Sequence, residues 1–245
     1  MWNERYGSEE YIYGTQPNVF LSENAKLLTG PVLSLAEGEG RNAVFLASLG
    51  LDVLGVDGSA VGLAKARTLA ESRGVGIKTE VADLAIYEPP ENCFGSVISI
   101  FAHLPSEIRR RLYPLVERSL KLGGIFLLEA YHKSQQSRNT GGPKDPDLLM
   151  TRLDLEEAFP NCEVILSQEI EREVIEGEYH TGLASVVQFG CDPRIAPKLI
   201  FPKRVVLAQD VGYQTNSPGK DSSWLTNLRY RLCFVQSPTS RFRLI

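Results

Sequence analysis

The chain has 245 residues, of which 43% are hydrophobic and 23% charged, as in a globular protein built around one large domain. No apolar run approaches the roughly 20 residues that span a bilayer, so we expect no transmembrane helix and no membrane partner. The net charge of −4 disfavours nucleic acid as a partner, and residues 1–5 do not resemble a secretory signal, so we expect a cytoplasmic protein.

From Pro31 onward, short β-prone runs alternate with helical patterns, which is typical of βαβ units around a parallel sheet. The pattern predicts strands at 32–36, 52–57, 77–81, 95–101 and 125–129. It predicts helices at 41–49 and 59–73, and a third helix that has Ser106 as its cap. Residues 120–124 contain two adjacent glycines and are expected to form a turn before the fifth strand.

The pattern then changes. Residues 139–146 are rich in glycine and proline and predict a loop, and 153–158 predicts a short helix. Two further strands are expected at 163–174 and 183–189, joined as a hairpin through 176–180. The predicted fold is therefore a Rossmann-like α/β domain over residues 1–190, with a seven-stranded sheet of five parallel strands and a C-terminal antiparallel hairpin, flanked by helices.

Residues 191–245 have a different composition. They contain 9 Lys and Arg against 3 Asp and Glu, whereas residues 1–190 contain 17 against 27. We expect a basic, flexible extension that the core reaction does not need. The four cysteines are scattered and the three histidines share no ligand spacing, so we expect unpaired thiols and no metal site.

Glycines lie between the first predicted strand and its helix, in the run Glu37-Gly38-Glu39-Gly40. Glycine at this position allows a tight turn and a close approach of a ligand to the backbone. Asp57 ends the next predicted strand, where a carboxylate can accept hydrogen bonds from both hydroxyls of a ribose. Both strand ends are expected to border one crevice, where open α/β sheets bind ligands.

A dinucleotide site is the main alternative, because residues 38–43 also fit the pattern Gly-x-Gly-x-x-Ala. However, Glu37 and Glu39 place two carboxylates beside the glycines, and they would repel a pyrophosphate at short range. A cationic ligand suits the site better. A glycine-rich turn that binds no ligand is the remaining interpretation.

The glycine turn, Asp57, the run Ala82-Asp83-Leu84 and the turn at 120–124 together resemble the class I S-adenosylmethionine-dependent methyltransferases in order and spacing. The likeness covers residues 1 to about 190, with Glu37 in place of the commoner aspartate. It implies S-adenosylmethionine as the cofactor. The residues implied for cofactor binding are Glu37, Gly38, Gly40, Asp57, Gly58, Asp83, Leu84, Phe101 and Ala102.

Within that superfamily, residues 2–6 and 10–18 resemble bacterial tellurite-resistance (TehB-like) methyltransferases. The aromatic residues Tyr6, Tyr11 and Tyr13 and the loop 139–143 are expected near the exposed methyl group, and few basic residues accompany them. This favours a small-molecule acceptor, and the family resemblance alone favours a sulfur, selenium or tellurium nucleophile. A nicotinamide-dependent oxidoreductase and a non-catalytic methyltransferase-like binding module stay open as alternatives.

Methyl transfer is an in-line displacement, so the enzyme mainly aligns the acceptor and excludes water. His103 is the candidate general base, because histidine titrates near neutral pH, but capping or solvent exposure is as plausible. Tyr13 is the candidate for covering the site as part of an N-terminal lid, although such aromatic clusters often only pack a terminal helix. The sequence does not identify the acceptor or the oligomeric state.

Overall fold

The computed structural model describes residues 2–177 and 181–193, and its seven strands form one sheet in the order β3-β2-β1-β4-β5-β7-β6. The strands are β1 (Val32–Leu35), β2 (Val53–Asp57), β3 (Lys78–Val81), β4 (Phe94–Ile100), β5 (Leu120–Tyr131), β6 (Cys162–Ile175) and β7 (Thr181–Pro193). Strands β1 to β5 pair in parallel, and β7 pairs antiparallel with β5 and β6. The predicted seven-stranded sheet is confirmed.

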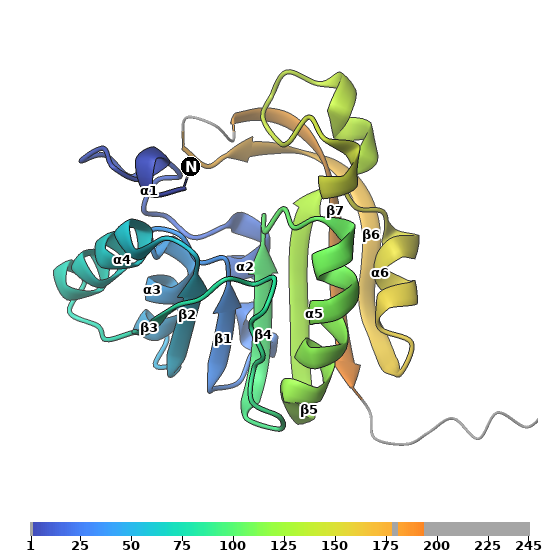
Figure 1. Ribbon diagram of the computed structural model, residues 1–245, viewed down its shortest axis with the longest axis horizontal. Helices are drawn as coiled ribbons and strands as arrows, with labels where there is room; N and C mark the ends of the chain where they lie inside the picture. The colour runs from blue at the N-terminus through green and yellow to red at the C-terminus, as the bar shows by residue number, and fades with distance from the viewer. Residues whose placement is uncertain (1, 178–180, 194–245) are drawn as a thin grey trace, which may run out of the picture. The chain divides into compact units, whose positions relative to one another are not determined.

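Helices connect these strands on both faces of the sheet. They are α1 (Trp2–Arg5), α2 (Val19–Asn24), α3 (Arg41–Ser48), α4 (Ala60–Ser72), α5 (Ser106–Ser119) and α6 (Arg152–Ala158), with 3-10 turns η1 (Ala25–Leu27), η2 (Lys133–Ser137) and η3 (Pro146–Leu148). Figure 1 shows α4 beside the β3 edge, and α5 and α6 against the half of the sheet that holds β5, β7 and β6. Helices α1 and α2 and the 3-10 turns were not predicted from the sequence.

Alternate residues of each central strand face opposite layers, because side chains change face at every residue of a strand. Leu33 of β1 joins the core beneath α5 and α6, whereas Val32 joins the core beneath α2 and α3. In β5, Leu128 joins the core beneath α5 and α6, and Leu127 joins the core beneath α2 and α3. Covered on both faces, these strands are buried along their length, which explains their continuous apolar runs.

Three sequence predictions needed correction. Residues 120–124 belong to β5: the register shifts between the pairs Phe94–Leu120 and Ser96–Ile125, so the expected turn is a bulge inside the strand, with Gly123 at φ 74°. Ser106 is the first residue of α5, and Pro105 occupies the cap position. The hairpin strands are longer than predicted, and β7 continues to Pro193 before the part of the expected extension that lies outside the described residues.

The carboxyl ends of the parallel strands meet at one edge of the sheet, the edge near which the N-terminal segment also lies (Figure 1). Two non-glycine residues adopt positive φ there: Ala36 after β1 and Phe101 after β4, both at 51°. Such conformations are costly and concentrate at functional sites. The positive φ values of Ala36 and Phe101 therefore indicate a functional site at this edge of the sheet.

Cys93, Cys162 and Cys191 are free thiols, as predicted, and Cys233 lies outside the described residues. Of the helices described between residues 2 and 193, none has the length and apolar character needed to cross a bilayer.

Candidate functional site

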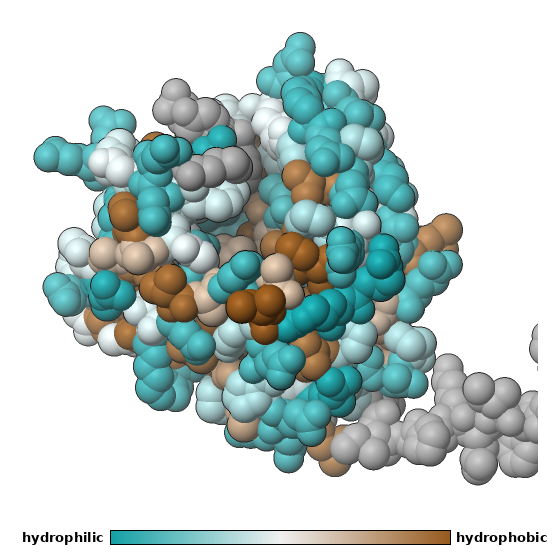
Figure 2. Space-filling view, in the orientation of Figure 1, coloured by the Kyte–Doolittle hydropathy of each residue, from teal (hydrophilic) through white to brown (hydrophobic). Residues whose placement is uncertain are grey.

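A cavity of about 510 Å³ opens at the carboxyl ends of β1, β2, β3 and β4. Its volume lies in the range of about 300–1,000 Å³ that is typical of small-molecule sites. Figure 2 shows a hollow in this face of the molecule, with hydrophobic side chains gathered below it. The cavity brings together ten of the eleven residues proposed from the sequence: Tyr13, Glu37, Gly38, Asp57, Gly58, Asp83, Leu84, Phe101, Ala102 and His103.

Gly40 is the exception. It does not line the cavity, and it adopts φ 95° at the N-cap of α3. A Cβ there would lie 2.6 Å from the Cα of Ala66 in α4. The absence of a side chain at Gly40 therefore allows both the turn and the close packing of α3 against α4.

Gly38 makes room for an aromatic side chain of the N-terminal segment. It has φ 63°, and a Cβ on it would lie 2.8 Å from the hydroxyl oxygen of Tyr6. A Cβ on Gly62 would lie 2.9 Å from Cδ2 of the same ring. Burial raises the pKa of the Tyr6 phenol well above its usual value, so this hydroxyl stays protonated.

Glu37 lines the cavity and also holds the glycine turn in place. One carboxylate oxygen accepts a hydrogen bond from the Ala43 backbone N–H at 2.9 Å, and the other accepts one from the Ser34 hydroxyl. Burial raises the pKa of Glu37 to about 7, although both hydrogen bonds oppose the shift. The carboxylate thus ties the end of β1 to the first turn of α3.

Asp57 lies at the end of β2 and is 6% exposed. Its two oxygens accept hydrogen bonds from the backbone N–H groups of Gly38, at 2.8 Å, and Ser59, at 2.7 Å. Burial raises the pKa of Asp57, and these two N–H groups counter the shift. Each carboxylate oxygen can accept a second hydrogen bond, so Asp57 retains capacity for two hydroxyl donors of a ligand.

The charges around the cavity are unequal in sign. Among the described residues that line it, four are carboxylates and one is a cation, Arg41: the carboxylates are Glu37, Glu39, Asp57 and Asp83. Glu39 is paired outside the lining, with Lys65 Nζ at 2.5 Å. This balance suits a ligand with more positive than negative groups and disfavours a doubly anionic pyrophosphate.

The N-terminal segment covers part of the cavity, with Trp2, Tyr6, Tyr13 and Gly14 in its lining. The Tyr6 ring stacks on Trp2, with centroids 5.6 Å apart, and meets Tyr13 edge-on at 6.4 Å. Arg5 Nη1 donates to the Tyr13 hydroxyl at 3.1 Å. Tyr11 lies elsewhere: its hydroxyl donates to the backbone oxygen of Lys65 in α4.

His103 lies just after β4, against aromatic rings. Its ring is nearly parallel to that of Tyr131, with centroids 5.4 Å apart, and is 6.0 Å from that of Phe101. Desolvation lowers the pKa of His103 to about 4. At neutral pH the imidazole is therefore uncharged and a weaker base than the sequence led us to expect.

The acceptor loop expected at 139–143 does not line the cavity. It packs on Tyr131 instead, since a Cβ on Gly142 would lie 2.8 Å from Cδ2 of that ring. The lining also includes apolar residues of α5 and the segment before it, Leu104 and Ile108, which the sequence did not single out. The helical spacing of Ile108 could have indicated a buried face, but not which cavity it borders.

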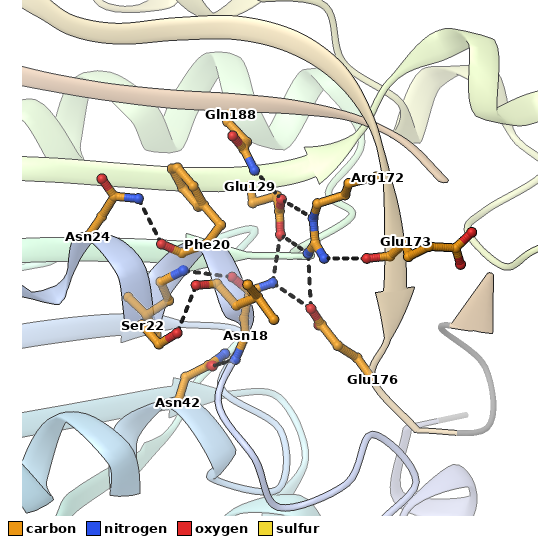
Figure 3. Close-up of polar contacts among 12 residues, drawn as sticks. Asn18, Phe20, Ser22, Asn24, Asn42, Glu129, Arg172, Glu173, Glu176 and Gln188 are labelled. Atoms are coloured by element: carbon orange, nitrogen blue, oxygen red, sulfur yellow. Dashed lines mark hydrogen bonds and ion pairs between the residues drawn. The ribbon is translucent and has the colours of Figure 1, made fainter. Parts of the chain in front are cut away.

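A buried polar network links the N-terminal segment to the sheet (Figure 3). Glu129 of β5 is fully buried and accepts hydrogen bonds from Asn18 Nδ2 at 2.6 Å, Gln188 Nε2 at 2.7 Å, and Arg172 Nε and Nη2 at 2.8 and 2.6 Å. Asn18 and Arg172 also donate to Glu176 Oε1, at 2.9 and 3.0 Å. The network joins the N-terminal segment to β5, β6 and β7. Sequence reasoning missed it because its members are far apart in the chain.

Comparisons with known proteins agree with this architecture. Residues 32–124 match a family model described as a methyltransferase domain. A 2-heptyl-1-hydroxyquinolin-4(1H)-one methyltransferase from Mycobacteroides abscessus is 26% identical over 140 residues, which cover 54% of this chain and 61% of that protein. The chain therefore matches less than two thirds of the length of this curated relative.

Two solved structures share the fold. One is described as "Conversion of a Disulfide Bond into a Thioacetal Group during Echinomycin Biosynthesis"; it is 22% identical, has a TM-score of 0.66, and the match covers 80% of this chain and 92% of that one. The other is TehB from Haemophilus influenzae, at 17% identity and a TM-score of 0.58, covering 79% of this chain and 66% of that one.

Proposed function

The chain belongs to the class I S-adenosylmethionine-dependent methyltransferases, and from this we propose that it transfers a methyl group from that cofactor to a small-molecule acceptor. The observation that carries the proposal is the excess of acidic side chains in the cavity lining, four against one guanidinium beside a glycine turn, although Glu37 has a raised pKa of about 7 and Glu39 is paired with Lys65. When bound, S-adenosylmethionine supplies a methyl group on a positively charged sulfur, already activated for in-line displacement. Its sulfonium and ammonium groups complement the carboxylates.

The residues of the cavity fit this cofactor. Asp57 would accept hydrogen bonds from the ribose hydroxyls with the capacity that Gly38 and Ser59 leave free. Leu84 is buried among apolar side chains after β3 and would flank the adenine, with Asp83 beside it. Gly38 would adjoin the methionine end. The covering rings of Tyr6 and Tyr13 would exclude water from the reacting groups.

The acceptor that the cavity favours is small and largely apolar. Phe101, Leu104 and Ile108 contribute apolar side chains to the cavity lining, which also includes the uncharged His103. The hydroxyquinolone in the name of the M. abscessus relative is a flat aromatic compound, which supports an acceptor of this kind. The test is an assay with labelled cofactor against flat heteroaromatic hydroxyl compounds, thiols and metalloid oxyanions. Methyl transfer to the heteroaromatic compounds supports the proposed acceptor, whereas transfer to the thiols or oxyanions indicates a chalcogen nucleophile. Transfer to no acceptor, with cofactor binding intact, would favour a non-catalytic binding module.

Gly58→Ala tests cofactor placement without disturbing the fold. An added Cβ would contact only the backbone oxygen of Ala82, at 3.8 Å, while Gly58 itself is part of the cavity lining. Overpacking of this kind costs about 1–3 kcal/mol, so calorimetry should show S-adenosylmethionine bound at least about fivefold more weakly. Gly76→Ala is the matched control, because a Cβ there meets nothing within 4 Å and the residue is remote from the cavity. Equal affinities in the two variants would place the cofactor elsewhere.

His103→Ala should lower turnover by less than about tenfold. A positioned general base contributes about 100- to 10,000-fold, and we do not expect the buried, weakly basic His103 to act as one. The pKa of about 4 leaves His103 neutral throughout pH 6–8, so the rate profile of the wild type should show no inflection from this group in that range. The measurement is initial rate against pH for both proteins. A loss of several orders of magnitude with cofactor binding preserved would contradict this, and would indicate an acceptor that His103 must deprotonate.

A further inference from the structure

The N-terminal segment, residues 2–18, covers part of the cavity although it buries little of its own surface. Between residues 2 and 17, Tyr6 is the one buried side chain. A segment with so few buried contacts opens easily unless polar contacts hold it. Its far end is fixed, because Asn18 is fully buried and hydrogen-bonded within the buried network (Figure 3). How well the cavity stays covered therefore depends on the contacts made by residues 2–13.

Lys65 of α4 supplies several of these contacts. Its Nζ donates hydrogen bonds to the backbone oxygens of Ser8, at 3.0 Å, and Glu10, at 2.6 Å. The Tyr11 ring covers the ammonium, with Nζ 4.9 Å from the ring centroid, and the Tyr11 hydroxyl donates to the Lys65 backbone oxygen at 3.1 Å. Residues 8–11 thus wrap around one lysine side chain, which is 15% exposed.

Glu39 fixes the direction of this ammonium. Its Oε1 atom lies 2.5 Å from Lys65 Nζ, and its Oε2 atom accepts a hydrogen bond from the Tyr13 backbone N–H at 3.4 Å. Glu39 is buried and belongs to the glycine turn. Glu39 and Lys65 both lie outside the N-terminal segment, so their ion pair does not depend on it. The pair leaves the other donors of the ammonium directed at the segment.

We propose that Lys65 is a positioning residue that holds residues 8–13 over the cavity and thereby slows the release of the bound cofactor. Lys65 does not line the cavity, so its effect on a ligand passes through the segment, which contributes Tyr6 and Tyr13 to the lining. The retained ligand is S-adenosylmethionine, and in this respect the inference rests on the proposed function.

Hydrogen exchange of the full chain, followed by mass spectrometry, tests the anchor without any ligand. Lys65→Met keeps the length of the side chain but removes its donors. It should speed amide exchange in peptides that cover residues 6–14 by about tenfold or more, because two hydrogen bonds to a charged group are lost. Exchange in β1 and β4 should stay as in the wild type. Unchanged exchange at residues 6–14, or an equal rise in every peptide, would overturn the proposal.

The second measurement is the dissociation rate of S-adenosylmethionine, from stopped-flow displacement. Lys65→Met should raise this rate by about tenfold, and Lys65→Arg, which keeps the charge and the donors, should restore most of the wild-type rate. Loss of a positive charge beside the cavity acts in the opposite direction by itself, because it favours a cationic ligand. A dissociation rate that is unchanged or slower in Lys65→Met would therefore overturn the proposal.

Arg67→Met is the matched control, since Arg67 is an exposed cation of the same helix that donates to Thr79 Oγ1 at 2.8 Å and does not contact the segment. It should change neither rate, and effects equal to those of Lys65→Met would overturn the proposal. A wild type that does not bind S-adenosylmethionine would overturn the proposed function, and the exchange measurement would still decide whether Lys65 holds the segment.

Should Lys65→Met fail to fold, Tyr11→Ala provides the test. It removes the ring and the hydroxyl that pack on Lys65 and should raise the same two rates by a smaller factor. Wild-type exchange at residues 6–14 in Tyr11→Ala would then contradict the proposal.

Discussion

Arg172→Met is expected to lower the free energy of unfolding by about 3–5 kcal/mol, because removing one partner of a buried ion pair leaves the other charge uncompensated. Arg172 donates two hydrogen bonds to Glu129 and one to Glu176, and both carboxylates are buried. Methionine has a similar length but cannot neutralise either charge. Urea unfolding followed by circular dichroism measures the effect.

Arg118→Met is the control for this prediction. Arg118 pairs with Glu91 at 3.0 Å, but both side chains are more than half exposed. Exposed pairs contribute about 0–1 kcal/mol, so this variant should differ little from the wild type. Similar losses in the two variants would show that the buried network does not have the energetic role assigned to it.

Asp57→Ala is expected to weaken S-adenosylmethionine binding by about 1.5–3 kcal/mol, or about 10- to 150-fold, because charge-assisted hydrogen bonds to the ribose are lost. The fold should persist, since the substitution removes acceptors from only two backbone N–H groups. Isothermal titration calorimetry measures the affinity, and thermal unfolding checks the fold.

Two further variants serve as controls for Asp57→Ala. Asp57→Asn keeps an acceptor for one N–H group and should fall between the wild type and Asp57→Ala. Asp52→Ala removes an exposed carboxylate paired with Lys78 near the opposite end of β2, away from the cavity, and should bind normally. An Asp57→Ala protein with unchanged affinity would remove Asp57 from the site.

Local signals were enough to predict the sheet. Each buried strand is a short apolar run, and parallel strands covered on both faces must be apolar throughout, so Val32 to Leu35 and Phe94 to Ile100 were recognisable. The strand ends at Asp57 and Phe101 were also recognisable from the sequence, because each follows such an apolar run. The carboxyl ends of parallel strands meet at one edge of the sheet. Residues that follow different strands could therefore be predicted to lie close together, and ten of the eleven proposed residues line one cavity.

What the sequence could not predict depends on contacts between distant segments. Gly40 follows the ligand-binding pattern, but its hydrogen faces Ala66, twenty-six residues away, and only the packing of two helices reveals this. Likewise, the pKa of His103 depends on burial against Tyr131 and Phe101, which spacing alone does not show. The bulge in β5 resembled a turn because Gly123 is compatible with both.

The most direct test of the central claim is a calorimetric titration of the full chain with S-adenosylmethionine and, separately, with NAD. We predict saturable binding of S-adenosylmethionine that Gly58→Ala weakens and Gly76→Ala does not, together with no detectable binding of NAD, whose pyrophosphate the cavity carboxylates repel. Binding of NAD without binding of S-adenosylmethionine would contradict the account and identify the glycine turn as a dinucleotide site.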